Sequence, residues 1–244
     1  MISDPAPAMA RFYLSPDSWN EEAWLAGDEA KHLSQVLRIR AGDTVTVFDG
    51  RGRRAEAVVR EVARDRVGLA LGETRTLPRM QPAMVLAIAI PKGKTMDLVV
   101  QKAVELGVAA IQPLVTRRTI VQPGDGKADK WRRVALEACK QCGTDFLPEV
   151  AEPLDFMKWL AAPPEGLRLI ASLAPGAREM RHVVRGAGEV PVVTTLVGPE
   201  GDFTPEETAA ALGVDFKPVT LGPTVLRTET AALFALSALR YEFA

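Results

Sequence analysis

Apolar runs that alternate with amphipathic helical patterns constrain the fold of this chain most strongly. Residues 84–90 are continuously apolar, which is typical of a strand buried on both faces of a sheet. The next segment repeats apolar residues with helical spacing, from a cap at Thr95 to a stop at Gly107. Further strand patterns lie at residues 111–115, 167–173 and 192–197. This alternation predicts an α/β domain whose mostly parallel sheet is covered by helices.

Three more helices are predicted between and after these strands. The first carries an apolar stripe over residues 131–142. The second opens with a capping box formed by Thr204 and Glu207, and the third spans about residues 228–241. Ligands of such folds bind outside the carboxyl ends of parallel strands, so the loops at those ends are the candidate site.

The first third of the chain has a different pattern, with short strands and little helix. Alternating apolar residues lead into an Asp49-Gly50 turn signal, and strand-like runs resume after it. This pattern predicts a small β-barrel within residues 1–75. Two prolines among polar residues indicate a linker at residues 76–82, which leaves residues 83–244 for the α/β domain.

Composition and charge limit the classes of function. No apolar run approaches the roughly 20 residues of a membrane span, and the N-terminus lacks a signal-peptide pattern, so we expect a cytoplasmic protein without membrane contact. The net charge is −1, but residues 31–80 carry eleven Lys or Arg against six Asp or Glu. A second basic cluster comprises Arg117, Arg118, Lys127, Lys130, Arg132 and Arg133. Such clusters either contact the phosphates of a nucleic acid or are simply the solvated faces of strands and a helix.

Two glycine–proline turns in the last third of the chain are the strongest candidates for a ligand site. The first is residues 198–201, Gly-Pro-Glu-Gly, and the second is residues 221–227, Leu-Gly-Pro-Thr-Val-Leu-Arg. Glycine permits backbone angles and close approaches that a Cβ forbids, so main-chain N–H and C=O groups can face a ligand there. Main-chain N–H and C=O groups of this kind can recognise an adenine and a ribose.

Two further motifs are excluded by their context. Residues 92–95, Lys-Gly-Lys-Thr, resemble the end of a phosphate-binding loop, but Ile88 stands where that motif needs its first glycine. Cys139 and Cys142 have redox or zinc spacing, yet they close a helix instead of opening one, and the two histidines of the chain are distant. We therefore expect no metal site and predict that both thiols pack in the core.

The two glycine–proline turns described above resemble those of the bacterial ribosomal RNA small-subunit methyltransferase E family of the SPOUT methyltransferases. The resemblance covers nearly the whole chain and is most specific at the two glycine–proline turns. It also includes Arg11-Phe12-Tyr13, His32-Leu33, Phe48-Asp49-Gly50, Lys92-Gly93-Lys94 and residues 101–107. The resemblance implies an N-terminal PUA-like β-barrel, a C-terminal α/β domain with a trefoil knot, and a homodimer.

The resemblance also implies methyl transfer from S-adenosylmethionine to N3 of a uridine in 16S ribosomal RNA of the small subunit. Arg227 is the expected catalytic residue, because its guanidinium can hold a uracil oxygen or stabilise the anionic ring. Glu229 either anchors Arg227 or is simply an acidic residue of the first helical turn. The expected cofactor-binding residues are Leu173, Leu196, Gly198, Glu200, Gly201, Leu221, Gly222, Leu226 and Thr228. The expected RNA-binding residues are Arg11, Arg38, Lys92, Lys94, Arg117, Gln141 and Thr144.

Two departures from the family pattern concern the expected site. Thr144 stands where relatives commonly have arginine, which removes one expected substrate contact, and Asp202 stands where they tend to have a second glycine, which is expected to alter the loop beside the cofactor. The alternatives are a SPOUT enzyme that acts on transfer RNA and a non-catalytic RNA-binding factor for ribosome assembly. Binding of S-adenosylmethionine separates the second alternative from an enzyme.

Overall fold

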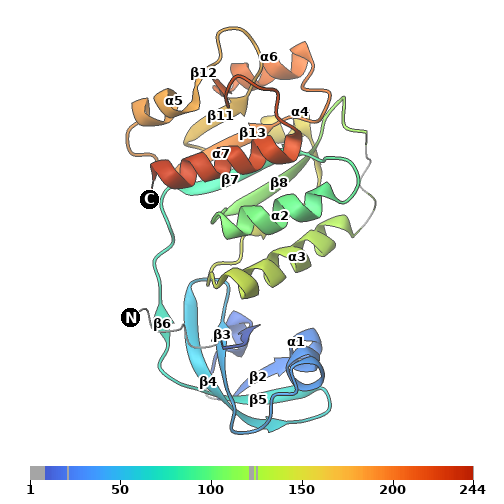
Figure 1. Ribbon diagram of the computed structural model, residues 1–244, viewed down its shortest axis with the longest axis vertical. Helices are drawn as coiled ribbons and strands as arrows, with labels where there is room; N and C mark the ends of the chain where they lie inside the picture. The colour runs from blue at the N-terminus through green and yellow to red at the C-terminus, as the bar shows by residue number, and fades with distance from the viewer. Residues whose placement is uncertain (1–8, 21, 121–123, 125, 244) are drawn as a thin grey trace. The chain divides into compact units, whose positions relative to one another are not determined.

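The computed structural model describes residues 9–20, 22–120, 124 and 126–243 of the 244-residue chain (Figure 1). These residues form two compact units. The first unit contains the described residues up to Arg79 together with Cys139–Leu147. The second contains the other described residues, from Met80 to Ala138 and from Pro148 onward.

The first unit is built on a curled sheet of short strands. Its strands are β1 (Arg11–Tyr13), β2 (Ala23–Ala26), β3 (Thr44–Phe48), β4 (Arg53–Val62), β5 (Arg66–Leu71) and β6 (Arg75–Thr76), and η1 (Pro16–Ser18) is a single 3₁₀ turn. The strand order is β1-β3-β4-β5-β2, with β6 paired to β4. β1 is parallel to β3, and the other neighbouring strands in the described residues are antiparallel. The small barrel predicted for this part of the chain is confirmed in the form of this curled sheet.

Alternation along β4 explains how the curled sheet gains a core. Ala55, Ala57 and Val59 are buried, whereas the side chains between them are exposed. The register of β4 against β5 shifts between Val59 and Glu61, and such a bulge increases the local twist of a strand. The sheet can therefore curl around its own apolar side chains.

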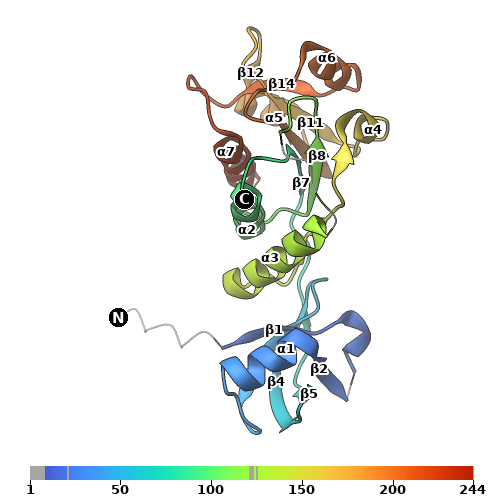
Figure 2. The ribbon, with the colours of Figure 1, turned by 90° about the vertical axis from the view of Figure 1, so that its right-hand side faces the viewer.

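A short helical segment covers part of this sheet. α1 (Gly27–Lys31) continues into a π-helical turn, η2 (His32–Val36), and packs against β2 and β5 (Figure 2). Ala30 and Leu33 are buried in the same apolar core as the residues of β4. Arg38 follows with a φ of 55°, a left-handed backbone that is uncommon outside glycine.

Three ion pairs in the described residues join Cys139–Leu147 to the rest of the first unit, and the longest of them, Arg54 Nη1 to Asp145 Oδ2, measures 3.7 Å. Arg11 Nη2 donates to Asp145 Oδ1 at 2.6 Å, and the side chains of this pair are 14% and 1% exposed. Lys140 Nζ donates to Glu29 Oε1 at 2.7 Å, and both side chains are again largely buried. Each buried charge therefore has a counter-charge, which a buried ion requires.

The second unit is built on a parallel sheet. Its strands are β7 (Ala83–Ala89), β8 (Ala110–Val115), β9 (Glu149–Val150), β10 (Leu154–Asp155), β11 (Leu167–Ala171), β12 (Arg178–Glu179), β13 (Val192–Val197) and β14 (Lys217–Thr220). Their order is β10-β8-β7-β13-β11-β14-β12, with β9 paired to β8. All of these pairs in the described residues are parallel. The predicted parallel sheet is confirmed.

Helices cover both faces of this sheet (Figure 2). They are α2 (Thr95–Glu105), α4 (Phe156–Leu160), α5 (Met180–Gly186), α6 (Pro205–Gly213) and α7 (Thr228–Glu242), and α3 (Lys127–Cys142) continues into the segment grouped with the first unit. α7 packs on α2 and against β7 and β13, whereas α4 packs on α6. Ala87 of β7 and Leu196 of β13 lie in one apolar core with residues of α4 and α6. None of the helices in the described part of the chain combines the length and hydropathy that a membrane span requires.

The structure confirms two of the predicted helix ends and contradicts one. The capping box is confirmed, because Thr204 Oγ1 accepts from the Glu207 N–H and a Glu207 carboxylate oxygen accepts from the Thr204 N–H. Gly107 follows the end of α2 with a φ of 82°, as expected of a helix stop. The predicted cap at Thr95 is wrong: Lys94 occupies the N-cap position without a side-chain cap, and Thr95 is already helical.

Replacing Asp145 with alanine is expected to destabilise the first unit by about 3–5 kcal/mol, because it leaves the buried Arg11 guanidinium without its counter-charge. Asp129→Ala is the control, since it removes a carboxylate that is 66% exposed and pairs with Arg132 on the surface, where about 0–1 kcal/mol is expected. Urea unfolding followed by tryptophan fluorescence measures both. Equal losses in the two variants would contradict the structural role of the Arg11–Asp145 pair.

Candidate functional site

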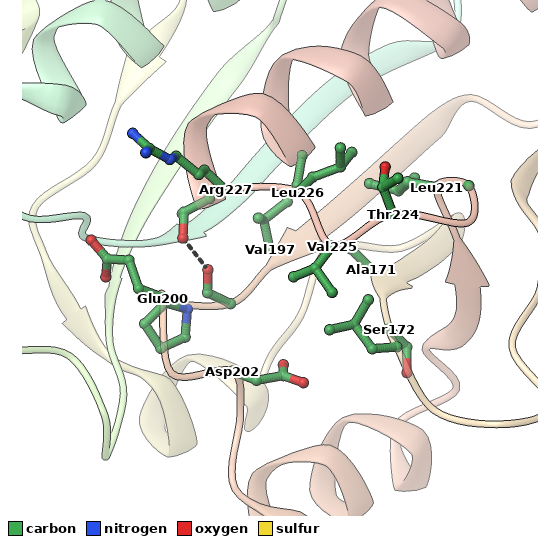
Figure 3. Close-up of a pocket in the computed structure, with 16 residues that line it drawn as sticks. Ala171, Ser172, Val197, Glu200, Asp202, Leu221, Thr224, Val225, Leu226 and Arg227 are labelled. Atoms are coloured by element: carbon green, nitrogen blue, oxygen red, sulfur yellow. Dashed lines mark hydrogen bonds between the residues drawn. The ribbon is translucent and has the colours of Figure 1, made fainter.

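The candidate site is a cavity at the carboxyl ends of β11, β13 and β14, next to the start of α7 (Figure 3). Its volume is about 250 Å³. The residues that line it are Ala171, Ser172, Leu173, Val197, Gly198, Pro199, Glu200, Asp202, Leu221, Gly222, Thr224, Val225, Leu226, Arg227, Thr228 and Ala231. Because β13, β11 and β14 are adjacent and parallel, the loops that follow them gather at one edge of the sheet.

The first glycine–proline turn follows β13 directly. The N–H of Asp202 donates to Pro199 O at 2.9 Å, which closes the turn. A Cβ at Gly198 would lie 3.1 Å from the ring of Phe203, so a larger residue would force that buried side chain to shift slightly. The close packing explains why glycine stands at this wall of the cavity.

The second glycine–proline turn follows β14 and depends on a glycine for a different reason. Gly222 has a φ of 126°, a backbone angle that residues with a Cβ rarely adopt. Thr220 Oγ1 donates to Gly222 O at 3.1 Å and fixes the start of the turn. The turn then places Leu221, Val225 and Leu226 against the cavity as its apolar wall.

A single hydrogen bond joins the two turns. Thr228, the first residue of α7, is buried, and its Oγ1 donates to Gly198 O at 3.1 Å (Figure 3). Arg227 precedes it in an extended conformation at the N-cap position, so its exposed side chain leaves the helix at the rim of the cavity. Within the described part of the chain, no ion pair joins Arg227 to Glu229.

Basic residues border the first turn on its other side. Glu200 Oε1 accepts from the Lys92 N–H at 3.1 Å, which ties the turn to the loop after β7. Arg118 Nη1 donates to Gly201 O at 2.6 Å. Arg117 beside it is exposed. The cavity therefore combines apolar walls and main-chain groups with basic residues beyond one of its turns, an arrangement that suits a nucleoside ligand next to a polyanion.

Comparison with known proteins agrees with this chemistry. Residues 79–240 match the RNA methyltransferase domain family, and residues 25–69 match the RNA methyltransferase PUA domain family. Ribosomal RNA small subunit methyltransferase E of Synechocystis is 33% identical over 84% of this chain and 68% of its own length. The chain belongs to the ribosomal RNA small subunit methyltransferase E family.

Solved structures of methyltransferases share the whole fold. A methyltransferase of Legionella pneumophila in complex with the bound cofactor SAM has a TM-score of 0.87 and 33% identity, over 97% of this chain and 98% of that one. Ribosomal RNA small subunit methyltransferase E of Neisseria gonorrhoeae, bound to S-adenosyl methionine, has a TM-score of 0.86 and 32% identity, over 96% and 98% of the two chains. The predicted combination of a PUA-like sheet and a SPOUT-type α/β domain is confirmed, and the trefoil knot stays a prediction.

Most of the cofactor-binding residues expected for this family lie together. Those that line the cavity are Leu173, Gly198, Glu200, Leu221, Gly222, Leu226 and Thr228. Leu196 is instead fully buried in the sheet core, and Gly201 packs against the Arg118 side chain. The assignment of these nine residues to the cofactor stays a prediction.

The expected RNA-binding residues divide between the two units. Lys92, Lys94 and Arg117 belong to the second unit and are exposed. The residues in the first unit are Arg11, Arg38, Gln141 and Thr144. Arg11 already donates to Asp145 and to Thr144 O, so its guanidinium has a structural role whatever else it contacts.

Sequence reasoning missed Ser172 in the cavity wall and placed Asp202 only in the loop beside the cofactor. Both residues line the cavity, and both also line a second cavity of about 270 Å³ beside Thr208. Asp202 has a left-handed φ of 60°. β11 was expected to run to Leu173 but ends at Ala171, which frees Ser172 and Leu173 for the loop. The place of Asp202 directly after the Gly-Pro-Glu-Gly motif agrees with its position at the cavity.

The two cysteines are in different environments. Cys139 is buried, as predicted, and burial raises the pKa of its thiol to about 12. Cys142 is exposed, so the prediction that it packs in the core is wrong: the apolar stripe of α3 ends one turn earlier. Among the described residues no group of three or more His, Cys, Asp or Glu is arranged to hold a metal ion.

Thiol labelling of the native protein at pH 8 is expected to modify one cysteine. The thiolate is the reactive form, and the raised pKa keeps Cys139 protonated at this pH while burial blocks the reagent. Cys142→Ser should remove the fast labelling and Cys139→Ser should retain it, as measured by intact mass after iodoacetamide treatment. Labelling of Cys139 at a rate similar to that of Cys142 would contradict its burial.

Proposed function

We propose that this protein transfers a methyl group from S-adenosylmethionine to N3 of a uridine in 16S ribosomal RNA. The observation that carries the proposal is the cavity between the two glycine–proline turns, with Arg227 at its rim. Relatives named ribosomal RNA small subunit methyltransferase E, and a solved relative bound to S-adenosyl methionine, support it.

The chemistry of the cavity suits the adenosine part of S-adenosylmethionine. Leu173, Leu221 and Leu226 offer apolar surface to an adenine, and turn backbones offer N–H and C=O groups to its edges and to a ribose. The second cavity, which shares Ser172 and Asp202, adds room beyond a nucleoside. When bound, this cofactor supplies a methyl group on a positively charged sulfur.

The chemistry at the uridine explains the role of Arg227. N3 is protonated and weakly acidic, so the nucleophile forms as its proton leaves and negative charge spreads over the uracil ring. A guanidinium stays charged at any working pH, so Arg227 is an electrostatic stabiliser and not a proton acceptor. Its extended backbone at the start of α7 directs it to the rim of the cavity, where a target base can approach.

N3 lies on the Watson–Crick edge, so the target uridine must be unpaired or flipped out before it can react. An RNA-holding surface is therefore part of the function. Lys92, Lys94 and Arg117 supply positive charge in the same unit as the cavity. The first unit, which includes Arg38 and Gln141, supplies the PUA-like sheet.

We further propose the division into a PUA-like domain at residues 1–75, a linker at 76–82 and a methyltransferase domain at 83–244. The two family matches, which end at residue 69 and begin at residue 79, support a boundary near this linker, and Cys139–Leu147 is the part of the methyltransferase domain that groups with the first unit.

A homodimer is proposed as well. Phe234 and Tyr241 lie two turns apart on one side of α7 and are 48% and 82% exposed, as expected of a helix face covered by a second copy. Action on ribosomal subunits places the enzyme in the cytoplasm.

Labelled methyl transfer tests the proposed function directly. Small ribosomal subunits that lack the modification are incubated with the protein and labelled S-adenosylmethionine, and the nucleosides are identified by mass spectrometry. N3-methyluridine is the expected product. Cofactor binding without methyl transfer to the subunits would contradict the proposed substrate, and transfer RNA would be tested next. Absence of cofactor binding would overturn the enzyme assignment.

Arg227→Ala is expected to lower kcat for this transfer by roughly 10²–10³-fold, because it removes one positioned group that stabilises the developing anion. The Kd for S-adenosylmethionine should stay within a few-fold of the unaltered protein. Arg227→Lys keeps the charge without the planar fork and should be intermediate. Undiminished transfer by Arg227→Ala would remove Arg227 from the mechanism.

Thr228→Val should weaken S-adenosylmethionine binding roughly fivefold, because losing the bond to Gly198 O costs about 1 kcal/mol and releases one turn from the other. Thr228→Ser keeps the hydroxyl and serves as the matched control. Titration calorimetry without RNA measures both. If the valine variant binds as well as the serine variant, the link between the turns does not shape the cofactor site.

A further inference from the structure

Arg118 contacts the first glycine–proline turn through its side chain. Its Nη1 donates to Gly201 O at 2.6 Å and approaches Phe203 O at 3.4 Å. A Cβ at Gly201 would lie 3.4 Å from Arg118 Cδ, so the arginine stem also covers the turn closely. Because Asp202, between these two carbonyls, lines the cavity, Arg118 fixes the backbone on either side of a cavity residue.

The segment that carries Arg118 is itself held in place. Thr116 and Thr119 are buried, their hydroxyls lie 2.9 Å apart, and the Thr116 N–H donates to Thr119 Oγ1 at 2.9 Å. The Arg117 N–H donates to Glu207 Oε1 at 2.8 Å. Residues 116–119 therefore form a turn, here named the arginine turn, which its two threonines close and which the Arg117 N–H ties to Glu207.

Glu207 extends this anchorage to α6. Its side chain is buried, and its other carboxylate oxygen accepts from the Thr204 N–H at 2.9 Å as part of the capping box. The Glu207 carboxylate thus accepts hydrogen bonds from both the arginine turn and the start of α6. The helix α6 begins at Pro205, three residues after the cavity residue Asp202. The arginine turn, the first glycine–proline turn and the helix start are connected by side-chain bonds at three points.

We propose that Arg118 is a positioning residue that joins the RNA-facing arginine turn to the cofactor turn, so that S-adenosylmethionine and RNA each strengthen the binding of the other. The proposal rests on the proposed function. The guanidinium has five donors, and the bonds to Gly201 and Phe203 leave others for an RNA phosphate. A ligand that orders either turn reduces the ordering cost for the other ligand, and such coupling is reciprocal.

Arg117 is the matched control for Arg118. The two arginines are adjacent and both exposed, so alanine at either position removes the same charge from the same surface. Only Arg118 reaches the cofactor turn through its side chain, since the bond from Arg117 to Glu207 is made by its backbone and survives the substitution. Arg118→Lys keeps one charged donor and is expected to restore part of the effect.

Titration calorimetry with S-adenosylmethionine, in the absence of RNA, is the first measurement. Arg118→Ala should raise the Kd roughly tenfold and Arg118→Lys by less, whereas Arg117→Ala should bind as the unaltered chain does. An unaltered Kd in Arg118→Ala, or equal losses in Arg117→Ala and Arg118→Ala, would overturn the proposal. If the unaltered chain itself fails to bind the cofactor, the proposed function falls instead.

The second measurement is the Kd for unmodified small ribosomal subunits with and without S-adenosylhomocysteine, which cannot donate a methyl group. The unaltered chain should bind subunits several-fold more tightly with this compound present. Arg117→Ala should bind more weakly in both conditions and keep that ratio, while in Arg118→Ala the ratio should fall to about one. A ratio retained in Arg118→Ala and Arg118→Lys would show that the arginine contributes charge alone and would refute the coupling.

Discussion

The hydrogen bond from Thr228 Oγ1 to Gly198 O is the contact on which the candidate site depends most. Gly198 follows β13 and Thr228 opens α7, and α7 packs along β13 and β7. The sheet and its helix therefore set the distance between the two glycine–proline turns, and the hydroxyl fixes their alignment. Without this hydroxyl the partly buried Gly198 carbonyl would lose its side-chain partner, and loss of one hydrogen bond costs about 1 kcal/mol.

Side chains from outside the first turn hold its carbonyls at two places. Thr228 donates to Gly198 O and Arg118 donates to Gly201 O. Pro199 O is bonded within the turn by the Asp202 N–H, whereas the carbonyls of Gly198 and Gly201 take side chains as partners. Fixing the carbonyls from two sides gives the turn a defined shape before a ligand arrives, which lowers the entropy that binding must overcome.

Features that depend on interactions within a few residues could be predicted from the sequence, whereas features that depend on contacts between distant residues could not. Gly222 and the Thr204–Glu207 capping box act within a few residues of themselves, so their roles were predictable. β9, β10 and β12 are two residues long and exist only through pairing with neighbours, which no local pattern reveals. The Arg11–Asp145 pair spans 134 residues, so the grouping of Cys139–Leu147 with the first unit was equally invisible.

Asp202 shows how one departure from the family pattern can be accommodated. Its φ of 60° explains why glycine suits this position, and among residues with a Cβ aspartate is one of the most tolerant of that conformation. Its Oδ1 also accepts from the N–H of Phe203 at 2.8 Å, which supports the turn locally. The backbone conformation open to glycine is therefore available to aspartate. What the substitution adds is a carboxylate at the junction of two cavities, so its consequence for the site is electrostatic and not conformational.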